Sequence, residues 1–139
     1  MGLPDSQRLS GVHILVVDDN RDARDILTTL LQYHGALVTA AATADAALRW
    51  FRHVKPDLIV SDLSMPKKDG FALIREIRQL KRERGGTVPA LAISAYDEDF
   101  HRQAVLQAGF QEYLVKPVDI RTLCSIVERL LVPTHPATR

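Results

Sequence analysis

The sequence is poor in three features that would each indicate a specialised class of protein. It has one cysteine, Cys124, among 139 residues, so no disulfide can form within the chain, which does not resemble a disulfide-linked secreted scaffold. Eighteen basic and seventeen acidic residues leave a net charge of +1, which gives no electrostatic argument for a nucleic-acid or membrane partner. Apolar runs such as Ile14–Val17 are far shorter than the roughly 20 residues of a membrane-spanning helix. These absences favour a soluble chain in the reducing cytoplasm.

What the chain does contain is the composition of one ordinary globular domain, with 46% hydrophobic and 25% charged residues. Residues 1–11 and 133–139 are rich in Pro, Gly, Ser and Thr. We therefore expect a flexible leader and a flexible tail at these two ends. Residues 12–132 are expected to form a single domain.

Short apolar runs rich in β-branched residues alternate along this domain with segments of helical periodicity. The five runs are Val12–Val17, Ala36–Ala40, Leu58–Val60, Val88–Ile93 and Tyr113–Val115. Several of them are almost continuously hydrophobic, as is expected of strands that helices cover on both faces. The pattern predicts an α/β fold with a five-stranded parallel sheet and right-handed crossover connections.

Capping residues indicate where helices begin, and the width of the apolar stripe indicates how well each helix can pack on the sheet. Asn20 or Asp22 is expected to cap the first helix, and Asp119 the last one. The segment from Asp97 to Ala108 has only a narrow apolar stripe. We therefore expect a short or mobile helix between the fourth and fifth strands.

The residues directly after the predicted strands carry the chemistry, because ligands of open parallel sheets bind beyond the carboxyl ends of the strands. Three carboxylates, a hydroxyl and an ammonium group follow these ends: Asp18, Asp19, Asp62, Ser94 and Lys116. Three acids at one edge repel one another unless a cation neutralises them. Oxygen ligands without a cysteine or histidine cluster favour a hard ion such as Mg²⁺. A nucleophile, a metal, a fixed cation and a hydroxyl donor are together what phosphoryl transfer requires.

Four segments in this order resemble the receiver domains of two-component response regulators and of hybrid sensor histidine kinases. The segments are Ile14–Asn20, Pro56–Pro66 with Asp69 and Gly70, Ser94 with Ala95, and Lys116 with Pro117. The resemblance covers about residues 11 to 132. It implies a doubly wound, flavodoxin-like sheet of strand order 2-1-3-4-5 with five helices. The lead-in Leu9–Val12 is more typical of receivers in hybrid kinases, and a single-domain regulator is the main alternative.

The same resemblance implies that Asp62 is a phosphoacceptor. It would receive a phosphoryl group from a phosphohistidine of a sensor histidine kinase or of a histidine phosphotransfer domain. Mg²⁺ would be held by Asp18, Asp19, Asp62 and the backbone carbonyl of Ser64. The output target of the signal is not indicated by any residue of the chain.

Further residues would recognise the phosphoryl group and transmit its arrival. Lys116, before an expected cis proline peptide, would contact the phosphoryl oxygens, and Ser94 would hydrogen-bond to them. Ser94 and Tyr113 would form the switch, although Tyr113 fits a core position equally well. The last two helices and the last strand, from about Asp97 to Leu131, would form the output face and a candidate homodimer interface. Tyr96 is expected to shield the acyl phosphate from water.

Two other functions remain open. A Mg²⁺-dependent phosphohydrolase also passes through an aspartyl phosphate, but such enzymes place an Asp-x-Asp motif after the first strand, where this chain has adjacent acids. A pseudo-receiver would keep the fold as an interaction module without phosphorylation, and the intact set of site residues argues against it. The favoured interpretation is a cytoplasmic signalling phosphoacceptor that catalyses only its own phosphorylation and dephosphorylation, and not an enzyme with separate substrates.

Overall fold

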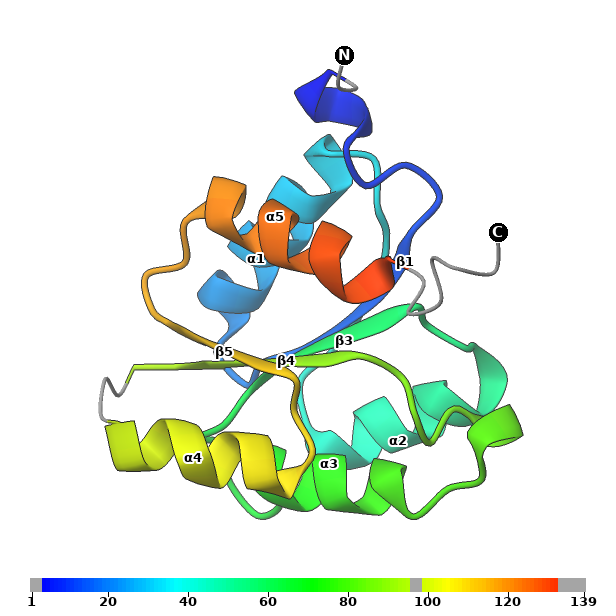
Figure 1. Ribbon diagram of the computed structural model, residues 1–139, viewed down its shortest axis with the longest axis vertical. Helices are drawn as coiled ribbons and strands as arrows, with labels where there is room; N and C mark the ends of the chain where they lie inside the picture. The colour runs from blue at the N-terminus through cyan, green and yellow to red at the C-terminus, as the bar shows by residue number, and fades with distance from the viewer. Residues whose placement is uncertain (1–3, 96–98, 133–139) are drawn as a thin grey trace.

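The computed structural model describes residues 4–95 and 99–132, so the predictions for Tyr96 and Asp97 lie outside the described residues. A parallel sheet lies between two layers of helices (Figure 1). The elements are η1 (Asp5–Gln7), β1 (His13–Val17), α1 (Arg21–Tyr33), β2 (Leu37–Ala41), α2 (Ala44–His53), β3 (Leu58–Asp62), α3 (Gly70–Arg78), η2 (Arg82–Arg84), β4 (Ala90–Ser94), α4 (Asp99–Ala108), β5 (Glu112–Val115) and α5 (Ile120–Leu131). The predicted α/β class with five helices is confirmed over these residues.

The sheet has the strand order β2-β1-β3-β4-β5, as the resemblance to receiver domains implied. Its register aligns the ends of the strands, because Val17 pairs with Ser61, Asp62 with Ile93, and Ser94 with Val115. All neighbouring strands run parallel. The residues that follow β1, β3, β4 and β5 therefore meet at one edge of the sheet.

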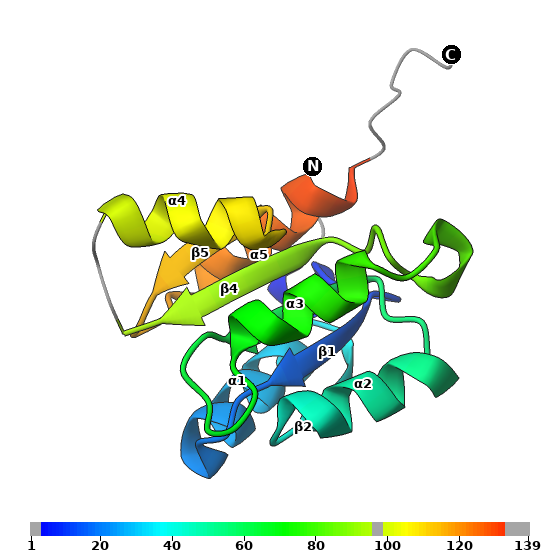
Figure 2. The same cartoon turned by 90° about the horizontal axis from the view of Figure 1, so that it is seen from below.

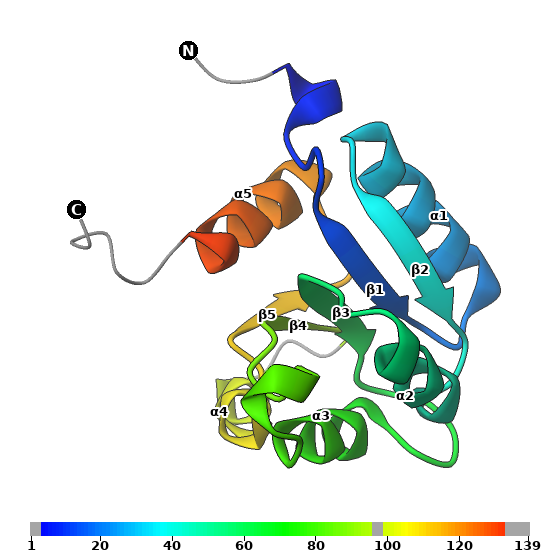
Figure 3. The ribbon, with the colours of Figure 1, turned by 90° about the vertical axis from the view of Figure 1, so that its right-hand side faces the viewer.

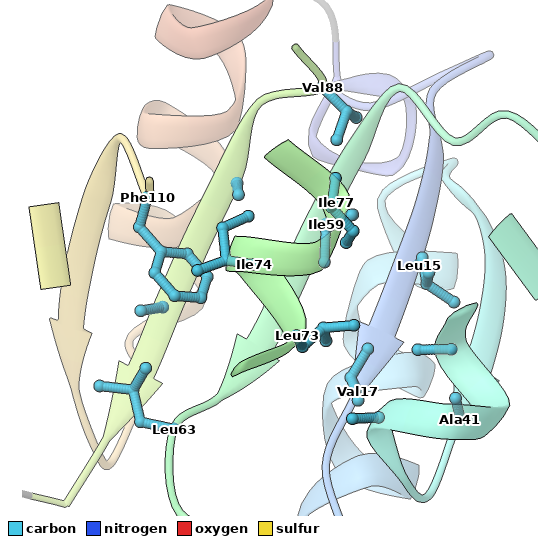
Figure 4. Close-up of a cluster of buried hydrophobic side chains, with 14 of the residues drawn as sticks. Leu15, Val17, Ala41, Ile59, Leu63, Leu73, Ile74, Ile77, Val88 and Phe110 are labelled. Carbon is cyan, nitrogen blue, oxygen red and sulfur yellow. The ribbon is translucent and has the colours of Figure 1, made fainter. Parts of the chain in front are cut away.

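Helices α1 and α5 cover one face of the sheet, and α2, α3 and α4 cover the other (Figures 1 and 3). Alternate residues of a strand point to opposite faces, so Leu15 and Val17 join the core under α2 and α3, whereas Ile14 and Val16 join the core under α1 and α5. Figure 4 shows the first of these cores, with Leu15 and Val17 facing side chains from the neighbouring helices. The continuous apolar runs seen in the sequence serve both cores at once.

The helix boundaries follow the expected caps. The side chain of Asn20 accepts a hydrogen bond from the Ala23 amide at the start of α1, and Asp119 accepts one from the Arg121 amide at the start of α5. Helix α4 is ten residues long, so its narrow apolar stripe is enough for a regular helix in this fold. No helix in residues 4–95 and 99–132 combines the length and apolar character needed to cross a membrane.

Part of the segment expected to be a flexible leader is packed against the domain. Leu9 is only 1% exposed and belongs to the core between α1 and α5, and its amide donates to the His34 carbonyl at 2.8 Å. The guanidinium of Arg8 donates to both carboxylate oxygens of Glu128 in α5, at 2.7 and 3.0 Å. This hydrogen bond holds the pKa of Glu128 below its usual range. A glycine, Gly35, admits the close approach of this segment, because a Cβ there would lie 3.1 Å from Ser10. The ordered domain thus begins before residue 12.

Candidate functional site

Two loops and one strand end bring the predicted charged side chains together at the carboxyl edge of the sheet. Asp18 and Asp19 follow β1, Asp62 is the last residue of β3, and Lys116 follows β5. One carboxylate oxygen from each of Asp18, Asp19 and Asp62 lies within 4.8 Å of the others. The Lys116 Nζ lies 3.2 Å from an oxygen of Asp18 and 3.6 Å from an oxygen of Asp62. The residues that the sequence singled out therefore form one cluster.

The charges of this cluster are poorly solvated and do not balance. Asp18 and Asp62 are buried, at 5% and 7% exposure, whereas Asp19 is exposed. Burial raises the pKa of Asp62 above its usual range, the nearby Asp18 carboxylate adds to this, and the ammonium of Lys116 opposes it. Three carboxylates facing one ammonium leave an excess of negative charge. An oxygen-only donor set with excess negative charge fits a hard divalent cation such as Mg²⁺.

Hydrogen bonds from the start of α1 fix the position of Asp18. The Asn20 amide donates to the Asp18 carboxylate at 2.9 Å, and the Arg24 guanidinium donates to the Asp18 carbonyl at 2.8 Å. Arg24 was not among the residues predicted from the sequence. Its position one turn into α1 was the available signal, but a contact with a backbone carbonyl leaves no pattern of paired charges in a sequence. Arg24 and Asn20 together attach the acidic loop to α1.

The loop after Asp62 is closed tightly on itself. The Gly70 amide donates to the Leu63 carbonyl at 3.0 Å, and a Cβ at Gly70 would lie only 2.4 Å from the carbonyl oxygen of Asp62. Asp69 caps α3, and Lys68 forms ion pairs with carboxylates of α2 and α3. The Ser64 amide donates to the Asp62 carboxylate at 3.3 Å. The loop thus fixes both the backbone and the side chain of Asp62.

The remaining predicted residues lie on β4 and β5. Ser94 ends β4 and is 1% exposed, and its carbonyl accepts a hydrogen bond from the Lys116 amide at 2.8 Å. The peptide bond between Lys116 and Pro117 is cis, as the resemblance implied. Tyr113 is buried, at 6% exposure, in the core under α3 and α4. Its core position is therefore observed, and its role as a switch stays a prediction.

An open, apolar cavity of about 430 Å³ lies beside the acidic cluster, between α1 and the loop from β5 to α5. Its walls are formed by Asp18, Ala23, Ile26, Leu27, Leu30, Ile93, Lys116, Pro117, Val118 and Ile120. Ile26 is 61% exposed at this position, although it lies on a helix with a well-defined apolar face. Asp18 and Lys116 contribute to both the cavity and the cluster, so the two features are continuous.

Known proteins resemble the chain over most of its length. The chain is 44% identical over 130 residues to an uncharacterized 14.6 kDa protein of Leptolyngbya boryana, and the match covers 94% of the chain and 98% of that protein. It is 36% identical over 125 residues to the response regulator MprA of Mycobacterium sp. (strain KMS), covering 90% of the chain and 53% of MprA. The chain thus spans about half the length of that regulator.

Solved structures with the same arrangement of strands and helices include the chemotaxis protein CheY4 of Vibrio cholerae, with a TM-score of 0.80 and 28% sequence identity. That likeness covers 86% of the chain and 98% of CheY4. The family model described as the response regulator receiver domain matches residues 14–128, which include every residue of the acidic cluster and Lys116. The chain therefore belongs to the response regulator receiver domain family of two-component signalling.

Proposed function

We propose that the chain is the phosphoacceptor of a two-component phosphorelay in the cytoplasm and that Asp62 receives the phosphoryl group. One observation supports this proposal above all. One carboxylate oxygen from each of Asp18, Asp19 and Asp62 lies within 4.8 Å of the others, and the Lys116 ammonium lies 3.6 Å from Asp62. A buried carboxylate beside a fixed cation, at the mouth of a parallel sheet, is a nucleophile placed where anionic oxygens are stabilised.

In the proposed reaction, a carboxylate oxygen of Asp62 attacks the phosphorus of a phosphohistidine. The new P–O bond forms as the P–N bond breaks, and the electron pair of the broken bond stays on the imidazole nitrogen of the donor. The Lys116 ammonium and the Ser94 hydroxyl bind the transferring oxygens, so the barrier falls through positioning and charge neutralisation. Later attack of water on the same phosphorus releases inorganic phosphate and restores the Asp62 carboxylate. The chain turns over no separate substrate in this scheme.

Asp18, Asp19, Asp62 and the backbone carbonyl of Ser64 are the ligands that we propose for Mg²⁺. The fit rests on the excess of negative charge in the cluster and on its oxygen-only donors. When bound, Mg²⁺ would neutralise these carboxylates and the charge that develops on the phosphoryl oxygens. Asn20 and Arg24 hold Asp18 in place for this role.

Phosphorylation would be read out on the surface formed by α4, β5 and α5. A phosphoryl group adds about −1.5 to −2 of charge and strong acceptor oxygens, which would draw the Ser94 hydroxyl toward Asp62. Ser94 is the register partner of Val115 on β5, two residues after Tyr113. A shift of Ser94 would therefore reach Tyr113 and the strand that carries it. This surface is also the proposed homodimer interface.

Replacing Asp62 with asparagine is expected to abolish phosphorylation, because the amide is a far weaker nucleophile than the carboxylate. The protein would be incubated with acetyl phosphate and Mg²⁺, and the added phosphoryl group detected by intact mass. Asp25→Asn, on the exposed surface of α1, is the matched control and should label like the wild type. Unchanged labelling of Asp62→Asn would disprove the assignment, and turnover of p-nitrophenyl phosphate would favour the phosphohydrolase instead.

Replacing Ile26 with aspartate is expected to slow phosphoryl transfer from a protein donor and not from acetyl phosphate. The apolar cavity beside Lys116 is where the surface around a donor histidine would pack, whereas acetyl phosphate needs no such contact. We expect a rate at least about tenfold lower with any phosphohistidine protein that labels the wild type. Tyr33→Asp, on the same helix but outside the cavity walls, is the control. Equal slowing with both donors would mean that Ile26 affects the site itself.

A further inference from the structure

A second hollow lies at the other edge of the sheet, where α2 and α3 end. These two helices lie side by side, as Figure 2 shows, and η2 follows α3. The hollow between α2, α3 and η2 has a volume of about 700 Å³. It is lined by Leu48, Phe51, Arg52, Lys55, Glu76, Leu80, Glu83 and Arg84, which we call the α2/η2 groove. None of these residues lines the acidic cluster, although Glu76 contacts the loop after Asp62 through its ion pair with Lys68.

The α2/η2 groove is built by contacts that fix its shape. One wall of the groove is formed by residues that recur at helical spacing. Three of them lie on α2 and the fourth, Lys55, lies in the loop after it: Leu48, Phe51, Arg52 and Lys55. The backbone of η2 approaches the Phe51 ring so closely that a Cβ at Gly85 would lie 2.7 Å from it. Across the groove, the Lys55 ammonium donates to the Glu83 carbonyl at 2.8 Å. The groove therefore exists before any partner binds.

Basic side chains outnumber acidic ones around this groove. Five exposed basic residues belong to the end of α2, the loop after it and the turn of η2: Arg52, Lys55, Lys81, Arg82 and Arg84. Within residues 4–95 and 99–132, none of the five forms an ion pair. Arg8, Lys68 and Arg129, on other surfaces, each pair with a carboxylate. The small net charge of the chain thus conceals a basic region at this edge.

The chemistry of the groove identifies the kind of partner that it fits. Leu48 is partly exposed, and Leu80, in the turn after α3, is 37% exposed, so both offer apolar surface, while the buried Phe51 ring contributes only its edge. Glu76 and Glu83 interrupt the basic wall. The evenly spaced phosphates of a nucleic acid would be repelled by these two acids. An acidic helix can place its carboxylates beside the arginines and its apolar side chains elsewhere, so it avoids this repulsion. The arrangement matches an amphipathic helix that lays an apolar stripe into a groove.

We infer that the α2/η2 groove docks an acidic amphipathic helix of a partner protein. Apolar side chains of that helix pack on Leu48 and Leu80, and its carboxylates pair with Arg52 and Arg84. This inference does not depend on phosphorylation of Asp62, because the groove lies at the opposite edge of the sheet. The protein would therefore carry two separate binding surfaces.

The test uses a fluorescein-labelled 20-residue peptide with Leu at the core positions of helical heptads and Glu at the others. Its binding to the full chain would be followed by fluorescence anisotropy. The double variant Arg52→Glu with Arg84→Glu is expected to bind at least about tenfold more weakly, since two favourable charge pairs become repulsive. Leu80→Asn should also weaken binding. Arg121→Glu, a single charge reversal on α5 outside the groove, should bind like the wild type.

Three results would overturn the inference: no binding of the Glu peptide to the wild type, equal binding to the double variant, or tighter binding of a 20-nucleotide single-stranded DNA that the double variant loses. The last would replace a protein partner with a nucleic acid. A peptide with Gln in place of Glu distinguishes charge pairing from apolar contact alone, and equal affinity for it would contradict the role of the arginines. All variants should retain the wild-type melting temperature and the labelling of Asp62.

Discussion

Replacing Lys116 with alanine is expected to slow phosphorylation of the protein by acetyl phosphate about 10²- to 10³-fold, the usual cost of removing one group that stabilises developing negative charge. The Lys116 ammonium lies 3.6 Å from the Asp62 carboxylate, where the transferring oxygens would arrive, and no second lysine or arginine contacts Asp62 among the described residues. The initial rate of labelling, measured by intact mass at saturating Mg²⁺, gives the effect directly.

The affinity for Mg²⁺ separates this role from a structural one. Removing an ammonium from the acidic cluster removes a competitor of the metal, so the dissociation constant for Mg²⁺ from titration calorimetry should stay the same or fall. Arg121→Ala, a cation lost from the exposed start of α5, should change neither quantity. If Lys116→Ala labels at the wild-type rate, Lys116 only balances the charges of Asp18 and Asp62.

Replacing Gly70 with alanine is expected to destabilise the fold and to impair the acceptor at the same time. The added Cβ would lie 2.4 Å from the Asp62 carbonyl oxygen and 2.9 Å from the Leu63 Cα, and both are backbone atoms that no rotamer change can move. Overpacking of this kind typically costs about 1–3 kcal/mol, and a backbone clash belongs at the upper end. The midpoint of urea unfolding should fall accordingly, and the displaced Asp62 should label more slowly.

Gly11→Ala is the matched control for this variant. Gly11 has a positive φ of 80° but nothing lies within 4 Å of the position of its Cβ. Alanine there should cost only the strain of the left-handed backbone, about 1 kcal/mol, and should leave labelling unchanged. A Gly70→Ala protein as stable and as active as Gly11→Ala would show that the loop after Asp62 relaxes easily.

Most of the fold was predictable because its determinants are local and repeated. The run from Ile14 to Val17 is apolar at every position, which indicates a strand covered on both faces, and Asn20 and Asp119 cap helices where their spacing predicts. The packing of the segment before β1 was not predictable. The packing of Leu9 against α1 and α5 depends on a few side chains in a segment whose composition is that of a loop. A single buried leucine gives no periodic signal.

The acceptor site was predictable because its residues follow the ends of parallel strands. Parallel strands end at one edge, so polar residues that follow Val17, Ser61, Ile93 and Val115 must converge wherever the sheet places those strands. The supporting contacts were missed, because Arg24 and Gly70 act on backbone carbonyls. The α2/η2 groove was missed for a different reason: Arg52 and Arg84 are 32 positions apart in the sequence and are brought together only by the path of the chain through β3 and α3.

The packed segment before β1 determines where the N-terminus of this protein can be truncated or fused to another protein. If the polypeptide began at Val12, it would lack Leu9, and part of the core that Leu9 shares with Leu31, Leu123 and Val127 would be uncovered. It would also leave Glu128 without Arg8. A shortened protein would expose an apolar surface on α1 and α5, beside the face proposed for output, and this surface would favour aggregation. Affinity tags, fluorescent proteins and tethers for force measurements therefore belong ahead of Asp5, where they leave these contacts intact.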